Sequence, residues 1–442
     1  MEKKIPTVSL LRFLRHSIDI LKNPLPFHRQ NFEKHGDTFR LMIGFGKSVV
    51  FSRDPAFARY TLQKNHKNYT KSTIQTEDVA KYVGKGLLTA EGEHWKKQRR
   101  LIQPAFHKKQ LTNLLEAVLE AIQAELLKIK TGSPQDIFPV FNDLAFQTVV
   151  KALFSSAVSP SEIKRLQLIT EETQQMLVKE LRQPYLKWWF HASGKLKSVL
   201  QLTAEAREIL RKLIHDRKLS NKKEGDLLDM LLDARYEDGS AMEEDQLIDE
   251  ILILFTAGHE TTSNALTFTC ELLARHPEVQ ENILLEVNRA SSKSENLMEY
   301  MQACPYTKQV VEESMRLYPP AYFIDRVNIE EDEFNGMKIP KGTNLLFSLH
   351  EIHIHPNFWE DPEAFKPERF SEGSVKYSSH YYPFGAGPRM CIGNNFAMYE
   401  MILAISETVS KYSISVKTTP IEILPLITLK PKDAILEFNL RE

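Results

Sequence analysis

Residues 384–393 read FGAGPRMCIG, and this stretch decides how the rest of the chain is interpreted. Three glycines and a proline surround Cys391, a composition that favours a tight, preset loop over a core strand. From Asn394 onward the sequence NNFAMYEMILAISETVSKY has helical periodicity. Cys391 is therefore expected just before a helix N-terminus, where backbone N–H groups and the helix dipole stabilise an anionic sulfur.

A lone cysteine is most often a small buried apolar residue, and that is the alternative reading of Cys391. The loop favours a ligating thiolate instead. The chain has 3 cysteines and no C-x-x-C pair, so neither a disulfide framework nor a zinc site is expected. Cysteine usage of this kind fits a reducing compartment, and we expect the cytoplasm.

The pattern F-x-x-G-x-R-x-C-x-G resembles the haem-binding signature of the cytochrome P450 family. The resemblance implies that Cys391 is the iron ligand of haem b, that Phe384 packs beside it and that Arg389 pairs with a haem propionate. A thiolate ligand favours O–O cleavage, and an arginine fork suits a carboxylate. The implied fold is mainly α with a minor β region. In it, helices form a triangular prism and the haem lies between a long oxygen-side helix and the helix that follows the cysteine loop.

Two further motifs match the family. Glu313 and Arg316 form an E-x-x-R pair at helical spacing, which puts both charges on one face. Arg369 lies in P-E-R-F (367–370), which resembles the loop that completes a buried triad with this pair. A surface ion pair is the alternative for E-x-x-R alone. With all three elements in order, we expect a structural triad.

Further residues are expected at the haem propionates. Trp95 and Arg99 are spaced i, i+4 on one helix face, as in the family's third helix. The alternative, an exposed basic helix, does not account for the tryptophan. Arg326 follows the E-x-x-R helix, where the family often places another propionate-binding residue.

The segment 257–262 reads AGHETT inside a long apolar helix and resembles the family's oxygen-binding segment. Small residues there leave room over iron, and we expect Gly258 to weaken the helix locally. Glu260 and Thr261 supply an acid and an alcohol, which can relay the two protons that dioxygen needs before its bond splits. This pair favours dioxygen as co-substrate. A helix cap is the alternative reading, and it fits poorly inside a long apolar helix.

Helical periodicity extends over most of the chain, and strand-like segments are few. Because residues from 95 to 391 are expected to serve one site, we expect a single domain over 1–442. Helices are predicted at 111–130, 136–155, 162–182, 203–219, 243–275, 277–292 and 305–317, and strands at 38–43, 48–51, 342–348 and within 423–439.

The overall charge is nearly balanced, at −1, so no global field favours nucleic acid. The apolar run 8–14 is interrupted by Arg12 and is too short for a membrane span or a signal peptide, so no membrane anchor is expected. We expect a monomer.

No flavin or nicotinamide motif occurs, so electrons are expected from a ferredoxin or flavodoxin with its reductase. Family analogy places a basic group near the thiolate face, where an acidic partner could be steered. A solvated helix face is an equal alternative. The basic residues are Lys96, Lys97, Arg100, Lys108 and Lys109.

Substrate is the least determined feature. Family analogy nominates a lining that includes Ile253, Ala257, Tyr322 and Phe323, together with a segment at about 180–192. That segment carries Arg182, Trp188 and Trp189, which either stack on and fix a polar ring or form an apolar lid over the channel; the lid is preferred. A hydroxylated or methoxylated small molecule, a fatty acid and a terpenoid all remain open.

The expected function is insertion of one oxygen atom of O2 into an organic substrate, by C–H hydroxylation or oxidative O-demethylation. One alternative is a haem-thiolate peroxygenase or isomerase that uses peroxide or a hydroperoxide. The other is a haem sensor without catalysis, in which His259 would provide a second iron ligand.

Overall fold

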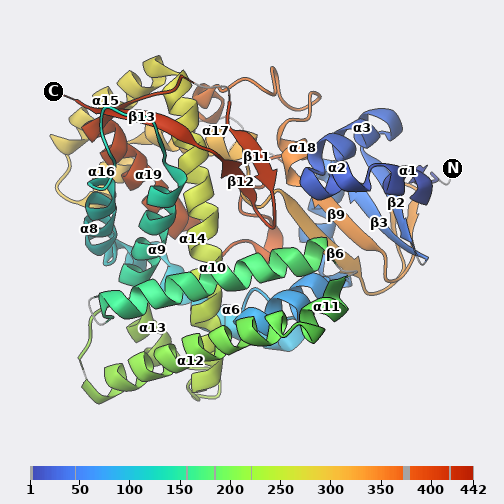
Figure 1. Cartoon of the computed structure of the whole chain (residues 1–442), viewed down its shortest axis with the longest axis horizontal. Coiled ribbons are helices and arrows are strands. Elements are labelled where there is room, and N and C mark those ends of the chain that lie inside the picture. Colours follow the sequence, from blue (N-terminus) through green and yellow to red (C-terminus); the bar gives the residue numbers. More distant parts are fainter. Residues whose placement is uncertain are drawn as a thin grey trace.

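The structure of the chain is a computed structural model, and it describes residues 3–44, 46–155, 158–183, 186–220, 222–371, 379–417 and 420–441. Helices make up most of it, and the strands that follow the N-terminal helices lie on one side, while the last strand lies near the C-terminus on the other side (Figure 1). The helices are α1 (Leu10–Arg15), α2 (Ser17–Lys22), α3 (Leu25–His35), α4 (Pro55–Arg59), α5 (Ala80–Val83), α6 (Gly92–Ile102), α7 (Lys108–Thr112), α8 (Leu115–Leu126), α9 (Phe138–Phe154), α10 (Pro160–Arg182), α11 (Lys187–Ala192), α12 (Lys195–Ser220), α13 (Leu227–Asp233), α14 (Glu244–Arg275), α15 (Pro277–Ser291), α16 (Leu297–Gln302), α17 (Pro305–Leu317), α18 (Leu349–His353) and α19 (Asn394–Lys411).

The strands form one larger sheet and three small ones within the described ranges. The larger sheet has the order β1-β2-β3-β9-β6-β4, in which β3 and β9 pair in parallel and β6 and β9 antiparallel. The strands are β1 (Thr7–Val8), β2 (Thr38–Gly44), β3 (Lys47–Ser52), β4 (Tyr69–Thr70), β5 (Gln135–Asp136), β6 (Phe323–Asn328), β7 (Asp332–Phe334), β8 (Met337–Ile339), β9 (Asn344–Ser348), β10 (Tyr412–Ser415), β11 (Glu422–Pro425), β12 (Leu429–Lys432) and β13 (Ile435–Leu440); short 3-10 or π segments are η1 (Tyr60–Lys64), η2 (His66–Asn68), η3 (Ile74–Val79), η4 (Gln103–Phe106), η6 (Pro367–Phe370) and η8 (Gly387–Arg389).

The sequence-based elements are confirmed with one exception. The helix predicted over 111–130 is two helices, α7 and α8, which separate at residues 113–114. Leu111 and Leu114 belong to one hydrophobic cluster and Leu115 to another, so the chain turns between the two cores that these leucines fill. Helical periodicity alone cannot show such a break, because both halves keep apolar residues at helical spacing.

Helix α14 is the longest helix described and runs through the middle of the helical region (Figure 1). Its N-terminal half, up to Phe255, packs in a cluster with α9, α10, α12 and α13. Its C-terminal half, from Ala265, packs in a second cluster with α8, α15, α17 and α19. Residues 256–264 belong to neither cluster, and this stretch contains the AGHETT segment. The helix ends at Arg275 because Pro277 begins α15.

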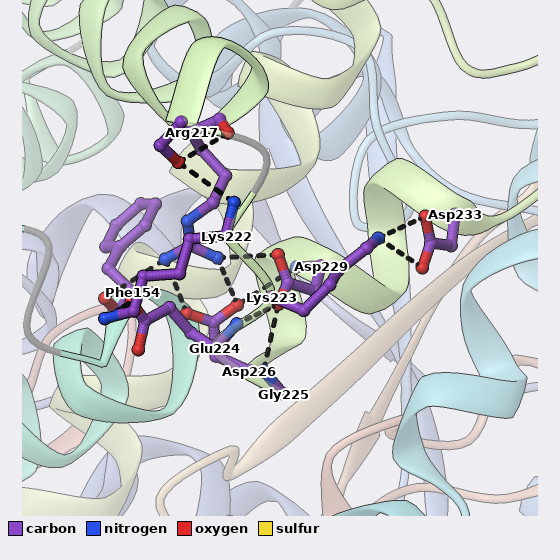
Figure 2. A network of polar contacts seen from close by, with 10 residues as sticks. Phe154, Arg217, Lys222, Lys223, Glu224, Gly225, Asp226, Asp229 and Asp233 are labelled. Atoms are coloured by element: carbon purple, nitrogen blue, oxygen red, sulfur yellow. Dashed lines mark hydrogen bonds and ion pairs between the residues drawn. The ribbon is translucent and has the colours of Figure 1, made fainter.

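A buried charge network fixes the end of α12 (Figure 2). The Arg217 guanidinium donates to both carboxylate oxygens of Asp226 at 2.8 Å and to Asp229 at 2.7 Å. Asp229 also accepts the backbone N–H groups of Glu224 and Gly225, at 2.6 and 2.9 Å. Because every charge here is paired inside the protein, the network holds α12 against the start of α13.

Candidate active site

The Cys391 loop is shaped by its glycines and closed by a backbone bond. Cys391 follows η8 and donates its backbone N–H to the Phe384 carbonyl at 2.9 Å. Gly387 has φ +72°, and a Cβ there would lie 1.9 Å from the Leu62 carbonyl oxygen, so no other residue fits. The loop therefore presents Cys391 in front of the N-terminus of α19, as the sequence predicts.

The Cys391 side chain is exposed, although protein surrounds it closely enough to desolvate it. Burial raises the pKa of the thiol, while the Gly393 backbone N–H and the Arg99 cation act in the opposite direction. The Arg99 guanidinium donates to the Met390 carbonyl at 2.8 Å and to Gln103 at 3.1 Å. These groups are suited to holding a sulfur that becomes anionic when a metal binds it.

In α14, Ala257 is exposed at the centre of an otherwise largely buried helix. The Thr261 hydroxyl donates to the Ala257 carbonyl at 2.8 Å, so the alcohol lies one turn along from this exposed position. The helix is continuous through Gly258. A Cβ at Gly258 would lie 2.9 Å from Val149, so the glycine permits close approach of α9.

The Glu260 carboxyl is almost fully surrounded by protein, and desolvation raises its pKa. Its Oε1 accepts the Thr428 hydroxyl at 2.8 Å. Thr428 lies in the turn between β11 and β12, and its hydroxyl also accepts the Asn264 amide at 3.0 Å. The sequence argument missed Thr428, since nothing in its local sequence marks it.

His259 lies on another side of α14 from Ala257. It is buried, its Nδ1 is 3.2 Å from the Phe255 carbonyl, and its ring packs edge-on against Phe146 of α9. Burial lowers the pKa of His259 to about 4. The residue on which the sensor alternative depended is therefore part of the α9–α14 contact.

Buried cations gather beside Trp95. The Arg389 guanidinium lies 5.0 Å from the Trp95 ring centre, pairs with Glu91 and donates to the Tyr69 carbonyl at 3.1 Å. Burial, followed by the charge of Arg389, lowers the pKa of Arg326 to about 10.

Lys71 joins this group although no sequence motif marked it. Its ammonium donates to the Leu87 and Ala90 carbonyls at 3.1 and 2.8 Å, and burial lowers its pKa to about 8. The charges that act on it are Glu91, Arg389, Arg326 and Asp325, so the cluster has three cations against two carboxylates.

The cluster fits a cofactor that carries carboxylates. Arg389 Nε is buried and has no hydrogen-bond partner within the described ranges. An anionic group here would supply the missing negative charge and an acceptor for that N–H. Together with the exposed thiol of Cys391 and the small residue Ala257, this donor set suits a haem with its propionates on the Arg389 side.

The expected triad forms in full. Arg316 makes a bidentate pair with Glu313, at 2.7 and 2.8 Å, and Arg369 adds a 3.3 Å contact to the same carboxylate. The remaining Arg316 donors reach the carbonyls of His353, Pro362 and Ala364. Glu313 and Arg316 are fully buried, so the triad ties α17 to the segment that leads to the cysteine loop.

The nominated substrate residues do not converge on one described cavity. Arg182 donates to the carbonyls of Leu21 and Pro425, and Tyr322 donates to Leu426 at 2.7 Å. Trp188 and Trp189 are exposed by 66% and 47% and face each other edge-on. Ile253 and Phe323 are largely packed in hydrophobic clusters, and residues 184 and 185 of the expected lid segment lie outside the described residues.

Within the described part of the chain, two of the surface hollows lie away from Cys391. One, of about 390 Å³, is lined by Arg29, Arg53 and Glu351, and the other, of about 320 Å³, by His191, Leu196 and Leu200 among others. Neither contains a residue of the cysteine loop or of the AGHETT segment. No helix in the described ranges combines the length and apolar character that crossing a bilayer requires.

Comparison with known proteins agrees with this geometry. The family model described as Cytochrome P450 matches residues 4–438. The chain is 28% identical over 402 residues to cyclooctat-9-en-7-ol 5-monooxygenase of Streptomyces melanosporofaciens, covering 90% of this chain and 87% of the relative. It is 29% identical over 429 residues to cytokinin hydroxylase of Arabidopsis thaliana, covering 94% and 83%.

Solved structures share the fold. The crystal structure of the cytochrome P450DA heme domain superposes with a TM-score of 0.85 at 21% identity, covering 100% of this chain and 99% of that one. The structure titled retinoic acid bound cyanobacterial CYP120A1 gives a TM-score of 0.84 at 23% identity over the whole of both chains. The mainly α fold with a minor β region is thereby confirmed.

Proposed function

The chain belongs to the cytochrome P450 family, and from that premise we propose that Cys391 binds the iron of haem b while Glu260 and Thr261 supply protons for the reduction of dioxygen. Its relatives include proteins named as a monooxygenase, an oxygenase and a hydroxylase, and the chain is a haem monooxygenase that uses dioxygen, a redox partner and a small-molecule substrate. The observation that carries the site assignment is the exposed Cys391 thiol in a glycine loop, beside a cluster with surplus positive charge.

When bound, the haem would activate dioxygen with two electrons, so that one oxygen atom enters the substrate and the other leaves as water. The chain's own residues then have separate tasks. Gly393 N–H would stabilise the sulfur, and Trp95, Arg326 and Arg389, with Lys71, would hold the propionates. Arg99, expected from the sequence at the propionates, donates instead to the Met390 carbonyl, and its charge acts on the sulfur. Phe384 fixes the loop through its carbonyl.

Proton supply is proposed to run through the acid and the alcohol of α14. The Thr261 hydroxyl donates to Ala257, which leaves its oxygen able to accept a hydrogen bond on the exposed side. Glu260 is the adjacent carboxyl whose pKa is raised by burial, which brings it closer to the range in which it can exchange protons near neutral pH.

The test measures coupling, which is the fraction of the consumed reducing equivalents that ends in oxidised product. Thr261→Ala should divert reducing equivalents to peroxide, and Glu260→Gln should slow turnover and lower coupling. Thr269→Ala is a matched control, because Thr269 makes the same i−4 hydrogen bond, at 2.7 Å to Ala265, in the same helix and away from this segment. Unchanged coupling in both Thr261→Ala and Glu260→Gln would contradict the proposed roles.

The acid–alcohol pair also bears on the peroxide alternative. A peroxygenase needs no proton relay of this kind, so the pair supports dioxygen with delivered electrons as the working reaction. Product formation with peroxide alone, at a rate that matches the reductase-driven reaction, would favour the alternative.

The electron donor is proposed to be an acidic ferredoxin or flavodoxin with its reductase. The basic group near the thiolate is partly neutralised, since Lys96 pairs with Glu93 at 2.5 Å and Arg100 with Glu237 at 2.7 Å. Both pairs are exposed and therefore weak, so a partner's carboxylates can replace them. Charge reversal at Lys97 and Lys108 should raise the apparent Kd for the electron-donor protein and make that Kd depend less on salt concentration.

The substrate is proposed to be a mainly apolar small molecule. The polar groups nominated to fix substrate hydroxyls, Arg182 and Tyr322, are bonded to main-chain carbonyls instead. Two relatives are named for action on cyclooctat-9-en-7-ol and on pentalenene, names that denote an alcohol and a hydrocarbon. A spectral screen for substrate-induced shifts should therefore give tighter binding for terpenes than for methoxylated sugars.

The organisation of the chain is proposed to be a single domain and a monomer located in the cytoplasm. What supports one domain is that α14 contributes residues to both large hydrophobic clusters, so a single helix joins the two cores.

A further inference from the structure

We infer that Thr428 is a positioning residue for the catalytic acid: its hydroxyl, held by Asn264, donates to Glu260 and fixes that carboxyl group. The inference rests on the proposed function, because it concerns how the proposed acid is kept in place. It adds a residue from the β11–β12 turn, 168 positions away in the sequence, to a relay that the sequence assigned to α14 alone.

The direction of the hydrogen bonds carries the argument. Glu260 and Asn264 are spaced i, i+4 on α14, so both face the same side of the helix. The Asn264 amide N–H donates to Thr428 Oγ1 at 3.0 Å, and Thr428 Oγ1 then has its own proton available for Glu260 Oε1 at 2.8 Å. Asn264 is fully buried, and within the described part of the chain its amide N–H donates to Thr428 while its Oδ1 has no partner.

The turn that carries Thr428 is held on several sides. Tyr322 donates to the Leu426 carbonyl at 2.7 Å, and Leu429 donates its backbone N–H to Pro320 at 2.9 Å. Arg182, at the end of α10, donates to the Pro425 carbonyl. Thr428 therefore has little freedom to move away from Glu260. Two residues nominated from the sequence as substrate contacts, Arg182 and Tyr322, anchor this turn.

A donor at this place has a defined effect on the acid. A hydrogen bond to a carboxylate favours its ionised form, and here it opposes the desolvation that raises the pKa of Glu260. The charged group that acts on Glu260 from outside α14 is Lys430 of β12. At the adjacent turn of α14, the charge of Asp143, from α9, raises the pKa of His259. Loss of the Thr428 hydroxyl should therefore raise the pH at which Glu260 ionises.

The direct measurement is an infrared pH titration of the carboxyl band in substrate-free, haem-loaded protein, with Glu260→Gln subtracted to identify the band. Thr428→Val preserves shape and removes the donor, and its titration midpoint should lie about one to two pH units above that of the wild type. Thr428→Ser keeps the hydroxyl and should titrate like the wild type. If Thr428→Val does not fold, Thr428→Ala and Asn264→Ala provide the same comparison.

Coupling measured over the same pH range separates this inference from the proposed function. If Glu260→Gln lowers coupling and Thr428→Val moves both the carboxyl band and the pH profile of coupling to higher pH, the proposed function and this inference are both supported. If Glu260→Gln lowers coupling while Thr428→Val titrates like the wild type, Thr428 does not position the acid and only this inference is overturned. If coupling in Glu260→Gln equals that of the wild type, the proposed role of Glu260 as the acid fails, and the role of Thr428 in the reaction fails with it.

Discussion

The Arg389 guanidinium lies over the ring of Trp95, 5.0 Å from its centre, and this contact joins the cysteine loop to α6. A cation over an indole face is favourable, more so when both are removed from water. The same guanidinium pairs with Glu91 at the start of α6. Residues almost 300 positions apart thus meet at one wall of the proposed haem site.

The buried cations of this wall should control how firmly the haem is held. Lys71→Met and Arg326→Met each remove a desolvated positive charge that a propionate would neutralise. Each variant should lose haem to a scavenging globin about ten-fold faster, as expected when one charge-assisted hydrogen bond is removed. Lys67→Met changes an exposed lysine four residues away and is the control. Equal rates of haem loss in all three variants and the wild type would contradict the assignment.

Cys391→Ser should abolish the strongly red-shifted Soret band of the ferrous–CO complex, because that band reports thiolate ligation. Cys270→Ala is the matched control. Its thiol is fully buried, and desolvation raises its pKa far above the usual value, so it cannot serve as the ligand. A red-shifted band that survives in Cys391→Ser would assign the ligand elsewhere.

The triad should be structural and not chemical. Glu313→Ala or Arg316→Ala leaves a buried charge without its partner, and the expected loss is about 3–5 kcal/mol in the free energy of unfolding, with little haem retained. Urea unfolding and the haem-to-protein absorbance ratio measure the two effects. Lys341→Ala removes one partner of an exposed pair with Glu330 and should cost less than about 1 kcal/mol. Full stability and full haem content in Arg316→Ala would argue against this role.

Glu400 should make stability depend on pH. Its carboxyl is buried on α19 and bonded to Thr148 of α9, and desolvation raises its pKa from 4.5 to about 8. The folded state therefore binds this proton more tightly than the unfolded chain. Its contribution is fully present below pH 4.5 and is lost as the pH rises through about 8.

Glu400→Gln carries no titrating proton and can still accept from Thr148. The fall in unfolding free energy between about pH 5 and pH 8 should shrink by on the order of 3 kcal/mol relative to the wild type. Urea unfolding at both pH values measures it, and Glu330→Gln, at an exposed position, should leave the pH dependence unchanged. An identical slope in Glu400→Gln and wild type would show that another group dominates.

Local sequence determined the parts of this protein whose chemistry lies within a few residues. The cysteine loop needs glycine at 387 because the backbone there has φ +72°, and the E-x-x-R pair forms within one helical turn. The end of α14 and the start of α15 follow from Pro277. Such features are readable because a backbone angle or an i, i+3 spacing fixes them before the chain folds.

The tertiary structure alone decided which distant groups face one another. Periodicity could not show that α7 and α8 separate, or that Gly258 permits the close approach of Val149. Lys71 joins Arg326 and Arg389, Thr428 reaches Glu260, and Arg182 and Tyr322 anchor a turn, and no motif marks these contacts. Burial and pairing at such sites depend on how separate elements pack, and side chains of the same type look alike in the sequence whether they are solvated or enclosed.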